Sequence, residues 1–98
     1  MRVVRSEHKI GDVRWRDFAT VEGTVRSLRA RPWAENMASV ECTLVDGSGG
    51  LELVFLGRRK VGGVGLGTRM RVAGRVGAHH GRLAILNPVY ELMSTENS

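Results

Sequence analysis

Residues 37–56, MASVECTLVDGSGGLELVFL, are the stretch that decides the fold. Val40, Cys42 and Leu44 alternate with polar residues, which is the period of a strand with one buried face. The segment DGSGG at residues 46–50 is a turn sequence, and the apolar residues 51–56 then return as a second strand. The stretch therefore predicts an antiparallel hairpin in an all-β protein.

The same period-two alternation occurs N-terminal to this hairpin, over residues 19–31. Val21, Gly23 and Val25 share one face of this long run, whereas Leu28 falls on the other. A glycine and a bulge would let one strand bend and pair along both edges of a curled sheet. We therefore predict a bulged first strand.

The C-terminal half continues the pattern after an irregular crossover at residues 58–67, RRKVGGVGLG, whose four glycines disfavour a helix longer than one turn. A fourth strand is predicted at residues 68–76, with arginines alternating against apolar residues, followed by a turn at 77–81. A fifth strand, residues 82–86, ends at Asn87 and Pro88, because proline cannot donate to a ladder. Residues 89–92 are expected to cap the edge of the barrel.

These segments predict one domain, because 98 residues leave room for a single hydrophobic core. Residues 1–18 are expected to form a lead-in. Within it, Asp12 ahead of Val13, Trp15 and Phe18 predicts a short helical turn or a segment that covers one end of the barrel. Residues 19–93 form the barrel, and residues 94–98 a flexible polar tail. Apolar runs fall far short of the roughly 20 residues of a membrane helix, so we expect a cytoplasmic protein without membrane contact.

Positive charge is concentrated in the second half of the chain. The formal net charge is +5, yet no acidic residue lies between Glu52 and Glu91, where seven lysines and arginines lie. Such asymmetry attracts a polyanion. The alternative is a solvated basic surface that only keeps the protein soluble.

Cys42 is the only cysteine, which excludes an intrachain disulfide and a cysteine-based zinc cluster within this chain. Its apolar neighbours on alternate positions predict a buried thiol that acts as a small hydrophobic side chain. A reactive cysteine would instead need an exposed, electropositive setting.

The predicted strands and their order resemble the OB-fold family, a five-stranded Greek-key barrel that binds nucleic acids and other ligands. The resemblance covers residues 19–93 and is carried by VEGTV at 21–25, by the hairpin of residues 44–53 and by GTRMRVAG at 67–74. NPVYE at 87–91 closes it in the manner of RecG-type helicase wedge domains and anticodon-binding OB domains.

The resemblance implies a binding surface on the second and third strands, flanked by the loop expected at residues 29–36 and the loop of residues 79–82. The outer sheet face would carry Glu41 and Glu52, whose exposed carboxylates would repel phosphate. Binding is therefore expected on the loops, the crossover and the basic fourth strand. The candidate nucleic-acid-binding residues are Arg26, Arg29, Arg31, Trp33, Arg58, Arg59, Lys60, Arg69, Arg71, His79, His80 and Arg82.

Trp33 has two interpretations at this point. Beside Arg31 it would offer a flat face to an unpaired base while the arginine meets phosphate. Alternatively, the indole folds back and plugs the open end of the barrel, because large aromatic side chains usually find burial.

No chemistry of its own is expected from this chain. His79 and His80 lack a third metal ligand nearby in the sequence, and no nucleophile with a partnered base can be assembled from the pattern. No cofactor is implied. The prediction is a non-catalytic binder of single-stranded or branched DNA, or of RNA, with low sequence specificity. The alternative is a protein-interaction module that uses an exposed strand edge or the apolar residues 89–93.

Overall fold

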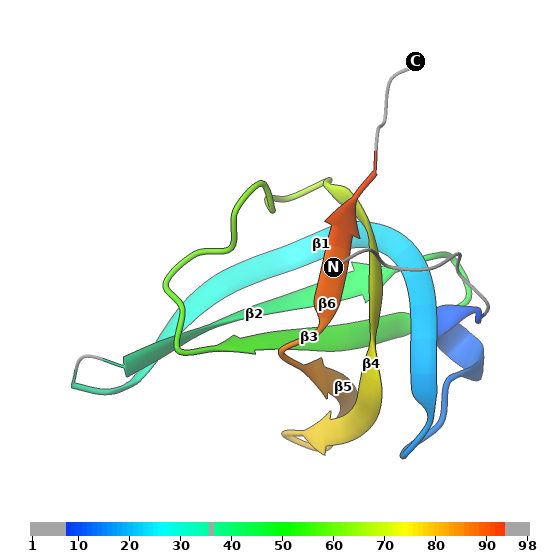
Figure 1. Ribbon diagram of the computed structural model, residues 1–98, viewed down its shortest axis with the longest axis horizontal. Coiled ribbons are helices and arrows are strands. Elements are labelled where there is room, and N and C mark those ends of the chain that lie inside the picture. Colours follow the sequence, from blue (N-terminus) through cyan, green and yellow to red (C-terminus); the bar gives the residue numbers. More distant parts are fainter. Residues whose placement is uncertain (1–7, 36, 94–98) are drawn as a thin grey trace.

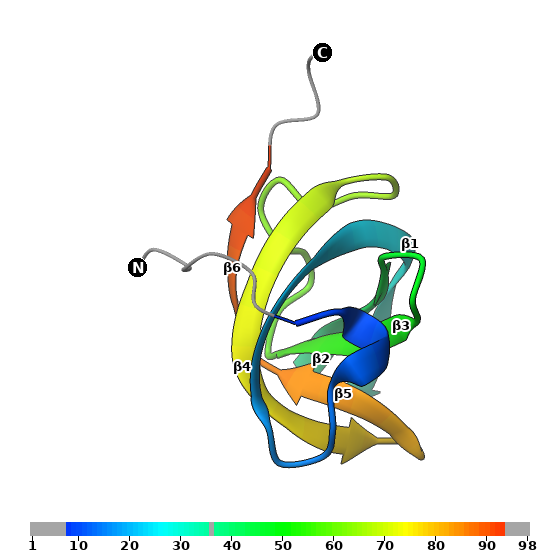
Figure 2. The ribbon, with the colours of Figure 1, turned by 90° about the vertical axis from the view of Figure 1, so that its right-hand side faces the viewer.

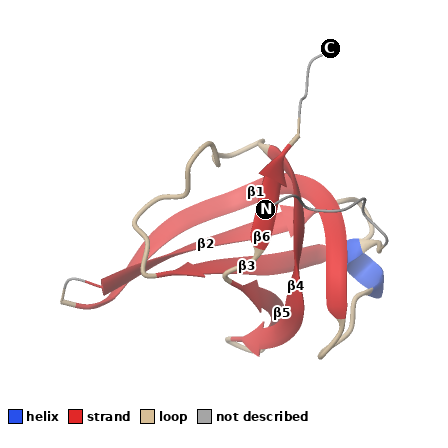
Figure 3. Ribbon diagram, viewed as in Figure 1, coloured by secondary structure: helices blue, strands red, loops and turns tan. Residues whose placement is uncertain are grey.

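The computed structural model describes residues 8–35 and 37–93, and of residues 33 and 34 only the backbone. Figures 1 and 3 show a structure built almost entirely from strands and loops. One short 3-10 helix, η1 (Ile10–Asp12), precedes the strands β1 (Phe18–Ala34), β2 (Met37–Val45), β3 (Gly50–Leu56), β4 (Arg69–His79), β5 (Arg82–Leu86) and β6 (Val89–Leu92). None of the described helices has the length and apolar character to cross a membrane.

Five strands close into a barrel in the order β1-β2-β3-β5-β4, with β4 pairing back to β1. The β3–β5 pair is parallel and the other pairs of the ring are antiparallel. The ring is visible end-on in Figure 2. The predicted all-β, five-stranded Greek-key barrel is thus confirmed, and β6 adds to it as an outer strand on β4.

The predicted bulge in the first strand is confirmed. Its register to β2 shifts between Val25 and Ser27, which places Arg26 at the bulge. The strand pairs with β4 up to Thr24 and with β2 from Thr24 onward. At Gly23, an added Cβ would lie 2.6 Å from the Val45 carbonyl oxygen, so this position accepts only glycine at the bend.

The prediction of a loop at residues 29–36 is wrong. β1 continues to residue 34, so Arg29 and Arg31 lie within the strand. Arg29 pairs with Glu41 and Arg31 with Ser39 across the β1–β2 ladder. Pro32 is tolerated because, among the described residues, this half of β1 pairs with β2 alone and is a sheet edge. The loop was expected from the resemblance, because OB barrels have a binding loop between their first two strands.

The turn between β4 and β5 is shorter than the predicted turn at residues 77–81. β4 runs to His79, which pairs with Arg82 in β5. Only His80 and Gly81 turn the chain, with φ values of 53° and 79°. Two consecutive residues with positive φ form the tight turn that suits the twist of a hairpin. As a result, both histidines lie at the tip of the β4–β5 hairpin.

The core fills the barrel with alternate side chains from every strand of the ring, including Leu44, Leu53, Met70, Val72 and Ile85. The crossover between β3 and β4 has no helix, as predicted, and contributes Val61 to this core. In Figure 2, η1 lies across the end of the barrel that faces the viewer.

Of the three lead-in residues expected to cover the barrel, Val13 is buried, and Trp15 and Phe18 are not. Ile10 and Val13 join the core, whereas Trp15 and Phe18 remain 57% and 61% exposed. Residues 1–7 and the tail 94–98 lie outside the described part of the chain.

Candidate functional site

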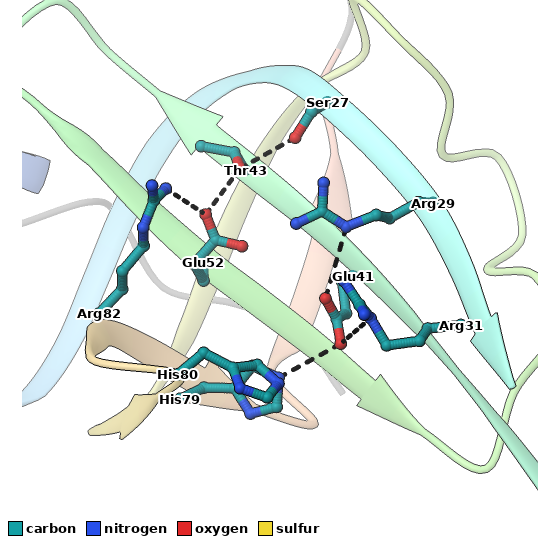
Figure 4. Close-up of a pocket in the computed structure, with 9 residues that line it drawn as sticks. All are labelled: Ser27, Arg29, Arg31, Glu41, Thr43, Glu52, His79, His80 and Arg82. Atoms are coloured by element: carbon teal, nitrogen blue, oxygen red, sulfur yellow. Dashed lines mark hydrogen bonds and ion pairs between the residues drawn. The ribbon is translucent and has the colours of Figure 1, made fainter. Parts of the chain in front are cut away.

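A groove of about 410 Å³ lies on the outer face of β2 and β3, between the second half of β1 and the tip of the β4–β5 hairpin. Figure 4 shows two arginines entering from β1 on one side, and Arg82 with the histidine tip entering from the other. Two carboxylates lie between them. The lining residues are Ser27, Arg29, Arg31, Glu41, Thr43, Glu52, His79, His80 and Arg82.

Glu41 forms the centre of the first ion-pair cluster. Its carboxylate lies 3.3 Å from Arg31 Nε, 3.6 Å from Arg29 Nε and 3.2 Å from His79 Nε2. Burial by itself would raise the pKa of Glu41. The hydrogen bond to His79 and the charges of Arg31 and Arg29 outweigh burial, so the pKa lies below its ordinary value and the carboxyl is ionised.

Glu52 forms the second cluster, at the other end of the groove. Its Oε2 accepts a hydrogen bond of 2.7 Å from the Thr43 hydroxyl, which in turn accepts one of 2.9 Å from Ser27. Arg82 Nη1 lies 3.7 Å from the same carboxylate oxygen. This chain of contacts fixes the Glu52 carboxylate, and Arg82 lies within ion-pair distance of it.

The two carboxylates of this face are buried, whereas alternation predicted them to be exposed. The Glu41 side chain is only 4% exposed, whereas that of Arg31 above it is 50% exposed. At the second cluster, the Glu52 side chain is 9% exposed and Arg82 is 75% exposed. The carboxylates therefore lie beneath the guanidinium groups and orient them, and three arginines against two acids leave the groove positive. Sequence alternation placed the acids on the outer face correctly but could not show what covers them.

The structure gathers five of the twelve candidate residues into this groove: Arg29, Arg31, His79, His80 and Arg82. Arg26 lines a neighbouring hollow that it shares with Arg82 and the glycine turn after β2. Arg59 and Lys60 line a separate hollow beside Leu28 and Val40, with Arg29 on its border. Arg58 is exposed in the crossover, and Arg69 lies near Leu92 of β6, away from the groove.

Arg71 lies between two carboxylates, away from the groove. Its Nε and Nη2 each lie 2.9 Å from Glu22 Oε2, and its Nη1 lies 3.2 Å from Glu91 Oε1. These contacts join β1, β4 and β6, so this guanidinium is engaged in holding the outer strand to the barrel. Trp33 belongs to the end of β1 by its backbone, but its side chain lies outside the described part, and so do both interpretations of it.

Glu41, His79 and His80 bring one potential metal-ligand atom each to within 4.8 Å of one another. The Glu41 carboxylate, however, already faces the positive charges of Arg29 and Arg31. A divalent cation at this point would meet two guanidinium groups at close range, which is electrostatically unfavourable. The cluster therefore fits an ion-pair network better than a metal site.

Sequence reasoning missed the hydroxyl groups of Ser27 and Thr43 that support Glu52. Ser27, Arg29 and Arg31 recur at every second residue, and this spacing was the available signal that they share a strand face with the groove. It also missed a second exposed group of side chains around Trp15, which the motif RWRDF at residues 14–18 could have suggested.

No known family model matches this sequence, and a search of curated proteins found none similar to it. A comparison of structures did find a match. The solution NMR structure of a replication factor A related protein from Methanobacterium thermoautotrophicum superposes with a TM-score of 0.66 and 17% identity, over 91% of each chain. Together with the closed five-strand ring, this likeness confirms that the chain adopts the OB fold.

Proposed function

We propose that this chain is a non-catalytic nucleic-acid-binding protein that holds single-stranded or branched DNA, or RNA, in the groove between β1 and the β4–β5 hairpin. The groove lies on the β2–β3 face, which is the face that OB barrels use for oligonucleotides. Its charged groups suit phosphate, and its contacts offer little that distinguishes one base from another, which favours low sequence specificity.

One observation carries this proposal: the guanidinium groups of Arg29, Arg31 and Arg82 are exposed while the carboxylates that orient them are buried. Arginines held in place lose less side-chain entropy when they bind phosphate than free ones do. His79 and His80 stand at the hairpin tip with ring centroids 4.1 Å apart, where their flat faces can stack on unpaired bases.

The direct test is a titration of fluorescently labelled single-stranded and forked oligonucleotides at about 50 mM and 200 mM salt. We expect measurable binding at the lower salt and much weaker binding at the higher, because phosphate contacts release counterions. Arg82→Ala should lower the affinity and reduce the salt slope by about one unit, as for other phosphate contacts. Arg82 suits this test because its exposed head has a single ion pair of 3.7 Å to lose.

Lys9→Ala is the matched control, since it removes one exposed positive charge beside η1 and outside the groove. It should leave the affinity close to wild type. Absence of binding at low salt would overturn the proposal, and so would binding that does not respond to salt.

The second candidate function is that of a protein-interaction module, and the free edge of β6 favours it. Within the described residues, β6 pairs with β4 along one edge only. Leu66 and Leu92 are exposed beside a hollow of about 380 Å³ at this edge. A partner strand could add here through main-chain hydrogen bonds. A partner captured after nuclease treatment, and lost on Leu92→Arg but not on Arg82→Ala, would favour this function over the first.

A further inference from the structure

A second surface lies outside the groove, where the lead-in meets β4. Trp15 and Phe18 are the aromatic side chains at its centre, and both are more than half exposed. The guanidinium of Arg16 lies 4.3 Å from the centre of the Trp15 ring, and that of Arg75 lies 5.9 Å from the centre of the Phe18 ring. Each exposed ring is thus accompanied by an arginine.

The backbone holds this surface firmly on β4. The Arg16 amide donates to the Val76 carbonyl at 2.8 Å, and the Val76 amide donates to the Asp17 carbonyl at 2.7 Å. The Arg75 side chain donates to the Arg16 carbonyl at 2.9 Å. Arg16 keeps a positive φ of 79°, a conformation that an arginine adopts only when its surroundings impose it. The main chain that carries the two rings is therefore fixed in position on β4.

The second surface is positively charged, as a surface that binds a polyanion would be. Residues 13–18 and the facing residues 74–76 contain Arg14, Arg16 and Arg75 against a single acid, Asp17. The Asp17 carboxylate accepts a hydrogen bond of 2.9 Å from the Arg14 backbone amide and so serves the turn. Flat rings beside arginines meet both requirements of single-strand binding, which are stacking for bases and positive charge for phosphates.

The surface also lies in line with the groove. Arg75 and His79 fall on the same face of β4, since they are four residues apart on a strand whose side chains alternate. Gly77 between them carries no side chain that would interrupt this face. At roughly 3.3 Å per residue the two positions are about 13 Å apart along the strand. A strand that leaves the groove at the hairpin could therefore continue along β4.

We propose that Trp15, Phe18, Arg16 and Arg75 form a second contact for single-stranded nucleic acid, which a strand bound in the groove reaches by continuing along β4. This inference rests on the function proposed for the groove. It assigns base stacking to Trp15 and Phe18 and phosphate contact to the two arginines. Short oligonucleotides would fill the groove alone, and longer ones would occupy both surfaces.

The test uses a Trp33→Phe background, in which Trp15 is the only tryptophan. Labelled oligonucleotides of about 4 and about 16 nucleotides span the site sizes of OB barrels. The longer one should quench Trp15 emission, whereas the shorter one should bind without this quenching. Trp15→Ala with Phe18→Ala should weaken the longer one about tenfold or more and leave the shorter one unchanged. Leu66→Ala, which alters another exposed apolar side chain, is the control and should change neither affinity.

This inference would be overturned if the longer oligonucleotide left Trp15 emission unchanged and bound the double variant as tightly as before. The groove function would then still stand. If wild type binds neither oligonucleotide, the groove function fails as well. Binding of the shorter oligonucleotide therefore tells a failure of this inference from a failure of the groove function.

Discussion

Arg31 lies over Glu41, with its Nε 3.3 Å from the carboxylate Oε2, and the pair bridges two neighbouring strands at the floor of the groove. Glu41 is on β2 and Arg31 on the long edge half of β1. A buried carboxylate lies beneath an exposed guanidinium group, and the same relationship recurs between Glu52 and Arg82. A face that carries two glutamates in the sequence is in this way a positive face in the folded protein.

The Glu41 carboxylate should make stability depend on pH. Its pKa in the folded state lies below the ordinary value of 4.5, so its ionised form stabilises the fold above that pH. This contribution is lost as the pH falls through the lower, folded-state pKa. Urea unfolding at about pH 7 should show Glu41→Gln less stable than wild type by about 1–3 kcal/mol. The difference should shrink toward zero in strong acid, and a difference that persists there would show that Glu41 acts through packing rather than charge.

Arg71 should contribute to stability and not to binding. Arg71→Ala removes the contacts to Glu22 and Glu91 that join three strands, so we expect a loss of about 1–2 kcal/mol in the free energy of unfolding. Its oligonucleotide affinity should stay within a few-fold of that of Arg69→Ala, a control that removes an exposed arginine two residues earlier on the same strand. A large, selective loss of affinity in Arg71→Ala would place this residue in the interface.

Gly23, the one glycine of β1, should not tolerate a larger side chain. A Cβ there would lie 2.6 Å from the Val45 carbonyl oxygen and 2.8 Å from Leu44 Cγ. Gly23→Ala should therefore cost about 2 kcal/mol or more, as overpacking of a core does. Gly62→Ala is the control, because nothing lies within 4 Å of its added Cβ. Thermal unfolding of both variants checks this, and equal melting temperatures would argue against a tight bend at Gly23.

Cys42 should be inert to thiol reagents in the folded protein. It is buried, and burial, followed by the nearby Glu52 charge, raises its pKa to about 12. A disulfide reagent at neutral pH should react only as the protein unfolds, so labelling should follow the unfolding transition in guanidinium chloride. Rapid labelling without denaturant would mean that β2 opens locally far more often than the rest of the barrel.

Much of the fold could be predicted from local pattern. The alternation in residues 37–56, the glycine turn within it and the change of face between Val25 and Leu28 predict the hairpin and the bulged first strand. The crossover was predicted as irregular because four glycines cannot sustain a helix. These features depend on backbone preferences and on the period of a strand, both of which are written locally in the chain.

The site could be predicted only in part, because it depends on which strands become neighbours. Alternation places Glu41 and Glu52 on the outer face, but their burial follows from β1 and the β4–β5 hairpin folding over that face. The resemblance implied a loop at residues 29–36, although β1 continues through Pro32, which an edge strand accepts. Trp15 was expected to cover the barrel together with Val13, yet Val13 packs there with Ile10 and the indole stays exposed. These outcomes depend on how the strands pack, which the local alternation of the sequence does not determine.

The central claim is that nucleic acid occupies the groove, and the amide chemical shifts of the isotope-labelled protein test it most directly. On addition of a short single-stranded oligonucleotide, the largest shifts are expected at Arg29, Arg31, Thr43, His79 and Arg82, with β6 nearly unchanged. Shifts confined to β6 and the crossover, or no shifts at low salt, would contradict the assignment of the groove as the binding site.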